Sequence, residues 1–293
     1  MIYYFLLAVS IILTVSKSSL YNAYAKAANP SLRYVFLFNG LGYGGAAICA
    51  LVALLFGGEI SISTPTVLSA LWYAVTVFAL QSVSIFAMRV GAMALTAICV
   101  MYGMIIPALA GPIFWDEPFG ILQGVGISLM VLSLWLLKGD SGEKSAPVSK
   151  KWLILAFVAF ILSGMSGLIE KIHQSTEGRE EKSSFVFLAC LMMFLISFIS
   201  FFFTKRKATD EVSMRTLLSI AIPVGIVIGF HSTTNLTLAG ALDSMIYYPV
   251  ANGGAMLLTV LVSRVIFKEL FTPAKLVGVA IGLAGIICLS LPI

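Results

Sequence analysis

The stretch "IFWDEPFG" at residues 113–120 has a weaker copy, "VIFKELFT", at residues 265–272. In both, a glutamate (Glu117 or Glu269) comes just before an apolar run that carries a glycine nine positions later. Either glutamate alone is explained by the first turn of a helix, where the positive end of the helix dipole favours an anion. The repetition at a distance of 152 residues, in a chain of 293, predicts two related halves.

The composition indicates an integral membrane protein. Hydrophobic residues make up 60% of the chain and charged residues 11%, and the mean hydropathy is +1.03. A soluble domain carries about 25% charged residues, so this chain cannot cover a surface that faces water. We therefore interpret the net charge of +5 connector by connector, and not as a surface that binds nucleic acid. The four cysteines lie singly in apolar runs, which is typical of packing residues.

Ten stretches approach the roughly 20 mainly apolar residues that a helix needs to cross the hydrocarbon layer. They cover residues 2–25, 33–56, 66–88, 91–114, 118–137, 152–173, 184–204, 215–238, 242–264 and 272–291. The polar connector at 138–151 separates five from five. We predict an all-α membrane protein of ten transmembrane helices, in which residues 1–140 and 151–293 form an inverted 5+5 repeat. Secondary transporters use this layout, with the substrate site between the halves.

Lysine and arginine are concentrated on one face of this arrangement. Connectors 1, 3, 5, 7 and 9 share a face and carry fourteen basic residues, against two or three on the other face. The fourteen are Lys26, Arg33, Arg89, Lys138, Lys144, Lys150, Lys151, Lys205, Arg206, Lys207, Arg215, Arg264, Lys268 and Lys275. The positive-inside bias then predicts that this face is cytoplasmic and that both termini are outside.

Lys17 lies within an apolar stretch, where burial of a charged group costs free energy. It precedes Lys26 by nine residues, about 13 Å along a helix axis, and burial at mid-depth costs at least about 2.5–3.5 kcal/mol. One interpretation is a lysine that reaches headgroups or a cluster of carbonyl groups. The other, which we favour, is a cavity residue, because polar residues recur beside it at helical spacing. This polar stripe contains Ser10, Thr14, Lys17, Ser18 and Tyr21.

Two further helices carry candidate site residues. The stretch 152–173 has Glu170 on a polar face, which suggests a pair with Lys17; alternatively this helix ends early and Glu170 lies in the interface. The stretch 215–238 places His231 and Asn235 one turn apart, for structural hydrogen bonding or for handling substrate and protons. No metal-ligand spacing accompanies His231. The other candidates for substrate binding are Gln81, Tyr102, Tyr248 and Asn252.

The chain resembles the drug/metabolite transporter superfamily, in particular its ten-helix EamA-type members. The resemblance rests on the 5+5 layout, on "DEPFGILQGVGISL" and "KELFTPAKLVGVAIGL", which open the last helix of each half, and on "NPSLRYVF" at 29–36. It implies a basket-shaped bundle whose cavity is lined by helices 1, 3, 4, 6, 8 and 9. It also implies cytoplasmic termini, against the charge bias, and family members often lack a charge such as Lys17.

These features predict a secondary active transporter of a small polar or amphipathic metabolite, such as an amino acid. It would work by alternating access in the cell's inner (plasma) membrane, with His231 and Glu170 as proton-coupling candidates. An exporter or exchanger of organic cations or drugs, bound by tyrosines through cation–π contact, is the alternative within the fold. A non-transporting membrane scaffold or sensor is the alternative of another class.

We expect no enzymatic activity, because an intramembrane enzyme built on His231, Glu170 or Asp243 would need a nucleophile or metal constellation that the sequence lacks. We also expect no cofactor or metal. The expected partners are a small-molecule substrate and membrane lipid but no nucleic acid, with a monomer as the expected state and a dimer as the alternative.

Overall fold

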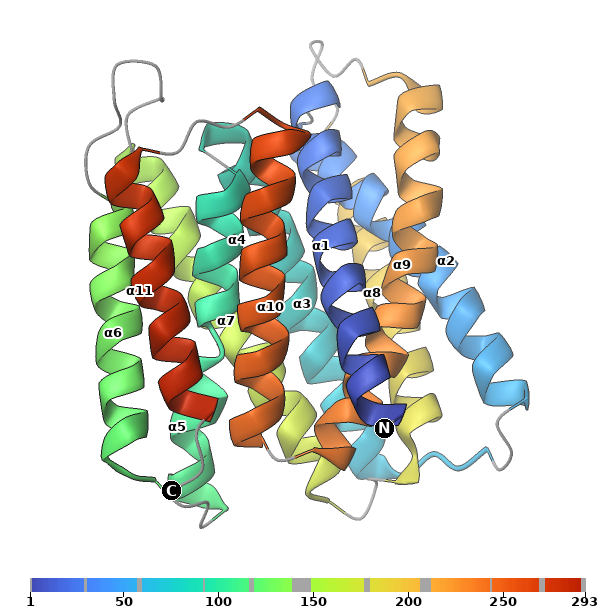
Figure 1. The fold of residues 1–293 in the computed structure, drawn as a ribbon. Coiled ribbons are helices and arrows are strands. Elements are labelled where there is room, and N and C mark those ends of the chain that lie inside the picture. Colours follow the sequence, from blue (N-terminus) through green and yellow to red (C-terminus); the bar gives the residue numbers. More distant parts are fainter. Residues whose placement is uncertain are drawn as a thin grey trace.

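The computed structural model describes residues 2–28, 31–56, 60–91, 93–115, 119–138, 149–176, 180–205, 212–242, 244–268 and 272–290. This part of the chain folds into α-helices and contains no β-strand (Figure 1). The helices are α1 (Ile2–Ala28), α2 (Leu32–Phe56), α3 (Thr64–Val90), α4 (Met93–Tyr102), α5 (Ile105–Phe114), α6 (Ile121–Lys138), α7 (Lys150–Gln174), α8 (Lys182–Phe203), α9 (Met214–Ala241), α10 (Ser244–Val265) and α11 (Pro273–Ser290). Glu117, Glu269 and Asp243 lie outside the described residues.

The fourth predicted span, 91–114, is present as one apolar segment from Leu95 to Phe114, and a short break divides it into α4 and α5. Gly103 and Met104 form a turn between α4 and α5. Pro107 explains the break: it has no N–H to donate to the carbonyl of Gly103, and its ring crowds that carbonyl. The N–H of Ile106 bonds the Gly103 carbonyl instead, at 3.0 Å. The regular i→i−4 hydrogen bonding of the helix is therefore interrupted between α4 and α5.

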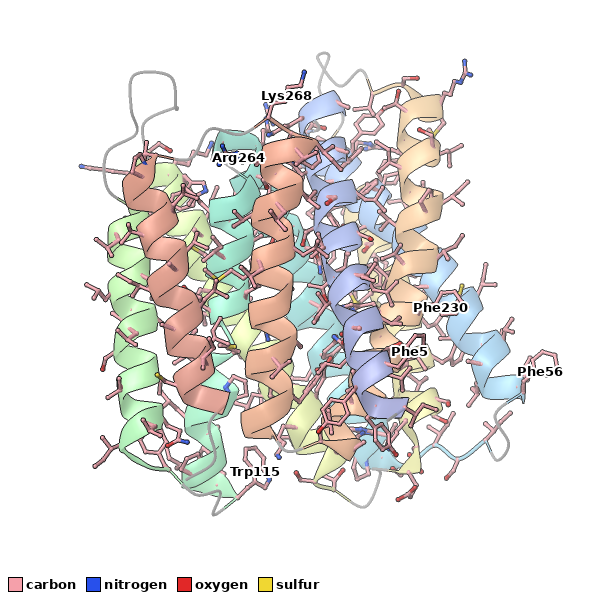
Figure 2. The ribbon with its side chains drawn as sticks, viewed as in Figure 1. Phe5, Phe56, Trp115, Phe230, Arg264 and Lys268 are labelled. Carbon is pink, nitrogen blue, oxygen red and sulfur yellow. The ribbon has the colours of Figure 1, made fainter. Side chains whose placement is uncertain are left out.

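The helices have the lengths and the outer surface of a multi-pass membrane protein. Seven helical segments of the described chain are long and apolar enough to cross a membrane: α1, α2, α3, α7, α8, α9 and the α4–α5 segment from Leu95 to Phe114. Shorter apolar segments lie in α6, α10 and α11. Phe5, Phe56 and Phe230 are 68%, 89% and 62% exposed and project outward from the bundle (Figure 2). Apolar side chains of this size on the outside are suited to lipid.

Two ends of the bundle differ in charge. One end, here named the basic end, holds the C-terminal turns of α1 and α10 with Lys26, Arg264 and Lys268 (Figure 2). The Lys26 ammonium lies 5.5 Å from the ring centroid of Phe267 at this end. The other end, here named the terminal end, is where α1 begins and α11 ends (Figure 1).

The packing partners of the helices follow a reciprocal pattern. α1 packs against α9 and α10, while α7 packs against α3 and the α4–α5 segment. α2 packs against α8 and α9, and α8 against α2 and α3, while α6 pairs with α11. Each predicted helix of the first half has an equivalent in the second half. When equivalent helices are exchanged, the α1–α9 contact becomes the α7–α3 contact, and the α2–α9 contact becomes the α8–α3 contact.

α1 and α7 run in opposite directions. Ile11 of α1 lies beside Gly254 of α10, and Lys26 lies beside the end of α10, so these two helices are parallel. The Tyr248 hydroxyl near the start of α10 donates to the Gly167 carbonyl near the end of α7, so α10 and α7 are antiparallel. The first helices of the two halves are therefore antiparallel to one another.

Glycines permit close approach where the halves meet. A Cβ atom on Gly103 would lie 2.7 Å from the backbone nitrogen of Gly164, and one on Gly164 would lie 2.7 Å from the Gly103 carbonyl oxygen. Since neither obstacle is a movable side chain, α4 and α7 touch through backbone at this point. Small residues at such crossings allow membrane helices to pack tightly.

Replacing Gly164 by alanine should therefore destabilise the protein, since overpacking of this kind costs about 1–3 kcal/mol. The matched control is Gly124→Ala on α6, where an added Cβ meets nothing within 4 Å. Thermal unfolding in detergent should show a lowered midpoint for the first variant and an unchanged or raised midpoint for the second. Equal midpoints would contradict the close approach.

Candidate functional site

A cavity of about 160 Å³ lies inside the bundle. Its walls come from α1, α3, α4, α5, α7, α9 and α10, with the α4–α5 turn at Met104 and the kink residue Pro107 among them. These are the helices that the family resemblance led us to expect. Of the nine predicted substrate-binding residues, eight line this cavity: Lys17, Tyr21, Gln81, Glu170, His231, Asn235, Tyr248 and Asn252.

A hydrogen-bonded junction joins α1 to α9 on one wall. The Ser10 hydroxyl donates to Asn235 Oδ1 at 2.6 Å, which orients the Asn235 amide. Asn235 Nδ2 then lies 3.1 Å from His231 Nε2, and Thr14 Oγ1 lies 3.0 Å from the same ring nitrogen. With the amide donating to Nε2, a neutral imidazole carries its proton on Nδ1.

A second junction joins α3 to α7 across the cavity. The Tyr73 hydroxyl donates to Glu170 Oε1 at 2.9 Å. One turn further inside α7, the Gly167 carbonyl accepts from Tyr248 at 3.3 Å. Asn252 Nδ2 is bonded to the Tyr248 carbonyl at 2.7 Å, and its side chain lines the cavity. Glu170 is thus held inside the bundle and not in the interface.

Lys17 lies between the two junctions. Its charge acts on Glu170 and on His231, and all three side chains face the same cavity. The structure therefore brings together one positive charge, one carboxylate and one imidazole from α1, α7 and α9. Such a set can bind an anionic group, a cationic group or both, and can accept or release a proton.

A smaller, more apolar chamber lies behind these charged groups. It has a volume of about 30 Å³, and Lys17, Tyr73, Glu170 and His231 line it as well as the main cavity. The rest of its wall is largely aliphatic and aromatic, from α2, α8 and α9: Tyr43, Phe185, Val186, Ala189, Cys190, Met193, Ile228, Ser232 and Leu236, together with Val77 of α3. The polar groups therefore stand between a mixed cavity and an apolar space.

Tyr102 is the predicted site residue that does not line the cavity. It is fully buried, and its hydroxyl lies 2.8 Å from Ser133 Oγ of α6. Ser133 in turn donates to the Gly278 carbonyl of α11 at 2.7 Å. The α4 helix turns this side chain toward the α6–α11 pair, so Tyr102 supports packing. Tyr102 therefore lies outside the cavity lining, and its contribution to the substrate site stays a prediction.

Tyr73 and Tyr247 line the cavity but were absent from our predicted set. Tyr73 stands on one face of α3 with Val77, Gln81, Ser84 and Met88, all of which line the cavity. The spacings of four, four, three and four residues mark this face in the sequence. Of this face, the predicted set contained only Gln81, the one amide among tyrosine, serine and apolar side chains.

Among the described residues, no group of three or more histidine, cysteine, aspartate or glutamate side chains could hold a metal ion. The cavity chemistry in this part of the chain therefore rests on one ammonium, one carboxylate, one imidazole, hydroxyls and amides.

Comparison with known proteins supports the fold and assigns no family. No family model matches the sequence, and no curated protein matches it. In contrast, 28 chains of solved structures match the fold. One of them, described as "Crystal structure of protein", has a TM-score of 0.67 and 12% sequence identity, covering 96% of this chain and 96% of its own. A likeness at this identity concerns the fold alone.

Tyr102→Phe should lower stability without changing ligand binding. Removing the hydroxyl leaves the buried Ser133 oxygen without its partner, which costs about 1 kcal/mol. Gln81→Leu, by contrast, changes a cavity-lining side chain and should alter binding. The measurement is the thermal midpoint with and without bound ligand for both variants. If Tyr102→Phe weakens ligand binding as much as Gln81→Leu does, Tyr102 contributes to the substrate site.

Proposed function

We propose that this protein is a secondary active transporter of a small polar or amphipathic metabolite, an amino acid or a related compound, and that it works by alternating access. The observation that carries the proposal is the placement of Lys17 and Glu170, charges of opposite sign from opposite halves, on one internal cavity. A charge inside a membrane bundle is costly and is typical of a substrate or ion pathway.

The shape of the site favours a substrate with both charged and apolar parts. The two charged groups can bind an amino and a carboxyl group, while hydroxyls and amides satisfy the remaining donors and acceptors. The apolar chamber adjoins the same charged groups, and its volume of about 30 Å³ can accept a methyl-sized apolar part. Sites of this kind combine mainly apolar walls with a few polar groups that fix orientation.

The His231 junction supports coupling to protons. Nε2 is within hydrogen-bond distance of both Thr14 and Asn235, and in the neutral ring described above it accepts from the amide. A proton on Nε2 would turn this atom into a donor, so the Asn235 amide could no longer donate to it. Because Asn235 also bonds Ser10, protonation would rearrange the α1–α9 contact. Glu170 is the second proton-coupling candidate, through its bond with Tyr73.

An inverted repeat of five plus five transmembrane helices supplies the two states that alternating access needs. The antiparallel directions of α1 and α7 and the reciprocal packing of the other helices support this arrangement. We place the protein in the cell's inner (plasma) membrane with the basic end in the cytoplasm, as the positive-inside bias favours. On this topology both termini are outside, opposite to the orientation that the family resemblance implies.

The alternative substrate is an organic cation or drug, moved by an exporter or exchanger of the same fold. Tyr73, Tyr247 and Tyr248 face the cavity and offer aromatic faces, which attract cations. Glu170 would then hold the cation, and Lys17 would oppose it. A non-transporting scaffold or sensor would show ligand binding at most and no flux.

Lys17→Ala should abolish transport or change its substrate while the fold persists, since removing a buried charge relieves its desolvation cost. The test is uptake by proteoliposomes under imposed pH and sodium gradients, with a panel of amino acids and of organic cations. Lys151→Ala, an exposed lysine at the start of α7, is the charge-matched control. Wild-type flux for Lys17→Ala with every active compound would place the site elsewhere.

His231→Ala should weaken the pH dependence of transport more than the affinity for substrate. Protonation of Nε2 would disrupt its contact with the Asn235 amide, so wild-type rates should vary with pH and those of the variant should vary less. The measurement is the pH profile of uptake and of binding for wild type and variant. Identical profiles would exclude His231 as the coupling group and leave Glu170, for which Glu170→Gln is the corresponding variant.

A further inference from the structure

At the terminal end of the bundle, a carboxylate from the second half of the chain contacts the N-terminus of α3 in the first half. Glu181 stands at the start of α8, but its side chain makes no capping bond to its own helix. Its Oε2 accepts from the backbone N–H of Ser63 and from the Ser63 hydroxyl, both at 2.9 Å, and its Oε1 accepts from Ser61 at 2.8 Å. Ser63 is the N-cap of α3, where the helix dipole favours an anion.

A buried layer lies between this contact and the cavity. His173, near the end of α7, is fully buried, and its Nε2 lies 3.2 Å from Thr66 Oγ1 of α3. Its ring stacks on Phe185 of α8 with the centroids 4.2 Å apart. Gln174 Nε2 lies 3.0 Å from the other ring nitrogen. Further in, Tyr73 and Glu170 form the contact that lines the cavity.

The cavity is asymmetric along α3. Its lining on this helix begins at Tyr73, nine residues after the first residue Thr64, and continues to Met88, two residues before the last residue Val90. On α7 and α10, in contrast, the lining lies closer to the terminal end: at Glu170, four residues before the last residue Gln174, and at Tyr247, three residues after the first residue Ser244. Three contacts, at Ser63, Thr66 and Tyr73, join α3 to α7 and α8 between the cavity and the terminal end.

We propose that Glu181, Ser61 and Ser63 form a latch that holds the terminal end of the cavity closed, and that access from this end requires the latch to release. The proposal rests on the proposed transport function for its purpose, but its geometry does not depend on any substrate. The latch joins the α2–α3 connector of the first half to the α7–α8 region of the second. Alternating access must separate such a contact between the halves.

The latch is a carboxylate contact that stays formed at physiological pH. Hydrogen bonds from Thr66 and from the Ser63 backbone lower the pKa of Glu181 to about 2. Because the folded pKa lies below the ordinary value, the stabilisation is present above about pH 4.5 and is lost only as the pH falls toward 2. Release therefore has to come from substrate binding or from movement of the halves, and not from protonation of Glu181.

Cysteine accessibility tests the latch without a known substrate. Ser166 lines the cavity and can carry a reporter, Ser166→Cys, after Cys49, Cys99, Cys190 and Cys288 are replaced by serine. A membrane-impermeant maleimide is applied to right-side-out and to inside-out vesicles, so that each end is probed separately. The protein with an intact latch should be labelled mainly from the basic end.

Glu181→Gln should raise labelling from the terminal end several-fold, because the neutral amide loses the negative charge that strengthens these bonds and that the N-terminus of α3 favours. Ser61→Ala should give a smaller rise, since one of the three bonds is lost. Ser128→Ala removes an exposed hydroxyl on α6, far from the latch, and should leave labelling as in the parent. The differences should be equal at pH 5.5 and 8.

Unchanged terminal-end labelling in Glu181→Gln and in Ser61→Ala, with thermal midpoints that show folded protein, would overturn the latch. So would an equal rise in the control Ser128→Ala. Flux in the proteoliposome screen together with unchanged labelling would reject the latch and keep the transporter. Increased labelling without flux of any compound would support the latch and count against the transport function.

Discussion

The Lys17 ammonium inside a lipid-spanning helix is the constraint from which the organisation of this bundle follows. Hydrocarbon offers no water to solvate the charge, so the surrounding helices have to supply polar groups, space or both. Here they supply a cavity, the Glu170 carboxylate and the polar faces of α3 and α9. The outward faces, in contrast, carry large apolar side chains. The bundle thus encloses a polar cavity within a largely apolar core, and its outer surface is apolar as well.

The two polar junctions that flank Lys17 both connect the halves. α1 and α9 meet through Ser10, Thr14, His231 and Asn235, and α3 and α7 meet through Tyr73 and Glu170. These two helix pairs exchange places when the halves are exchanged, although their residues differ. A group that binds between the junctions touches both halves at once. A substrate or proton there can therefore change how the halves pack, which is the physical requirement for coupling binding to a conformational change.

Much of the site could be predicted from the sequence because polar residues in apolar helices are conspicuous. Lys17, Glu170 and His231 stand out by their cost, and spacing at three and four residues adds Tyr21 and Asn235. Tyr102 could not be placed in this way: the chain turns at Gly103 and Met104, and this turn sends its hydroxyl toward Ser133. Tyr73 was missed because its partner Glu170 is 97 residues away, and spacing within α3 does not reveal such a contact.

The fold was predictable for a different reason, namely the number and length of apolar stretches. The seven longest segments can be recognised by hydropathy alone. The break between α4 and α5 follows from Pro107 only once the helix is known to continue past it, since proline kinks and proline ends look alike in sequence. The close contact of Gly103 with Gly164 depends on how two distant helices cross. No local pattern contains that information.

Divergence between the halves gives the bundle a direction. Two identical inverted halves would make the states open at either end equal in free energy, and neither end would be favoured. In this chain the terminal end has the Glu181 contacts, the buried His173 layer and the Tyr73–Glu170 pair in series along α3. In the proposed alternating-access mechanism, opening that end would separate all three contacts, and the closed state would be favoured until a ligand compensates. A ligand can do this only by binding the other state more tightly, and the charged groups at the inner end of this series are where such a difference would arise.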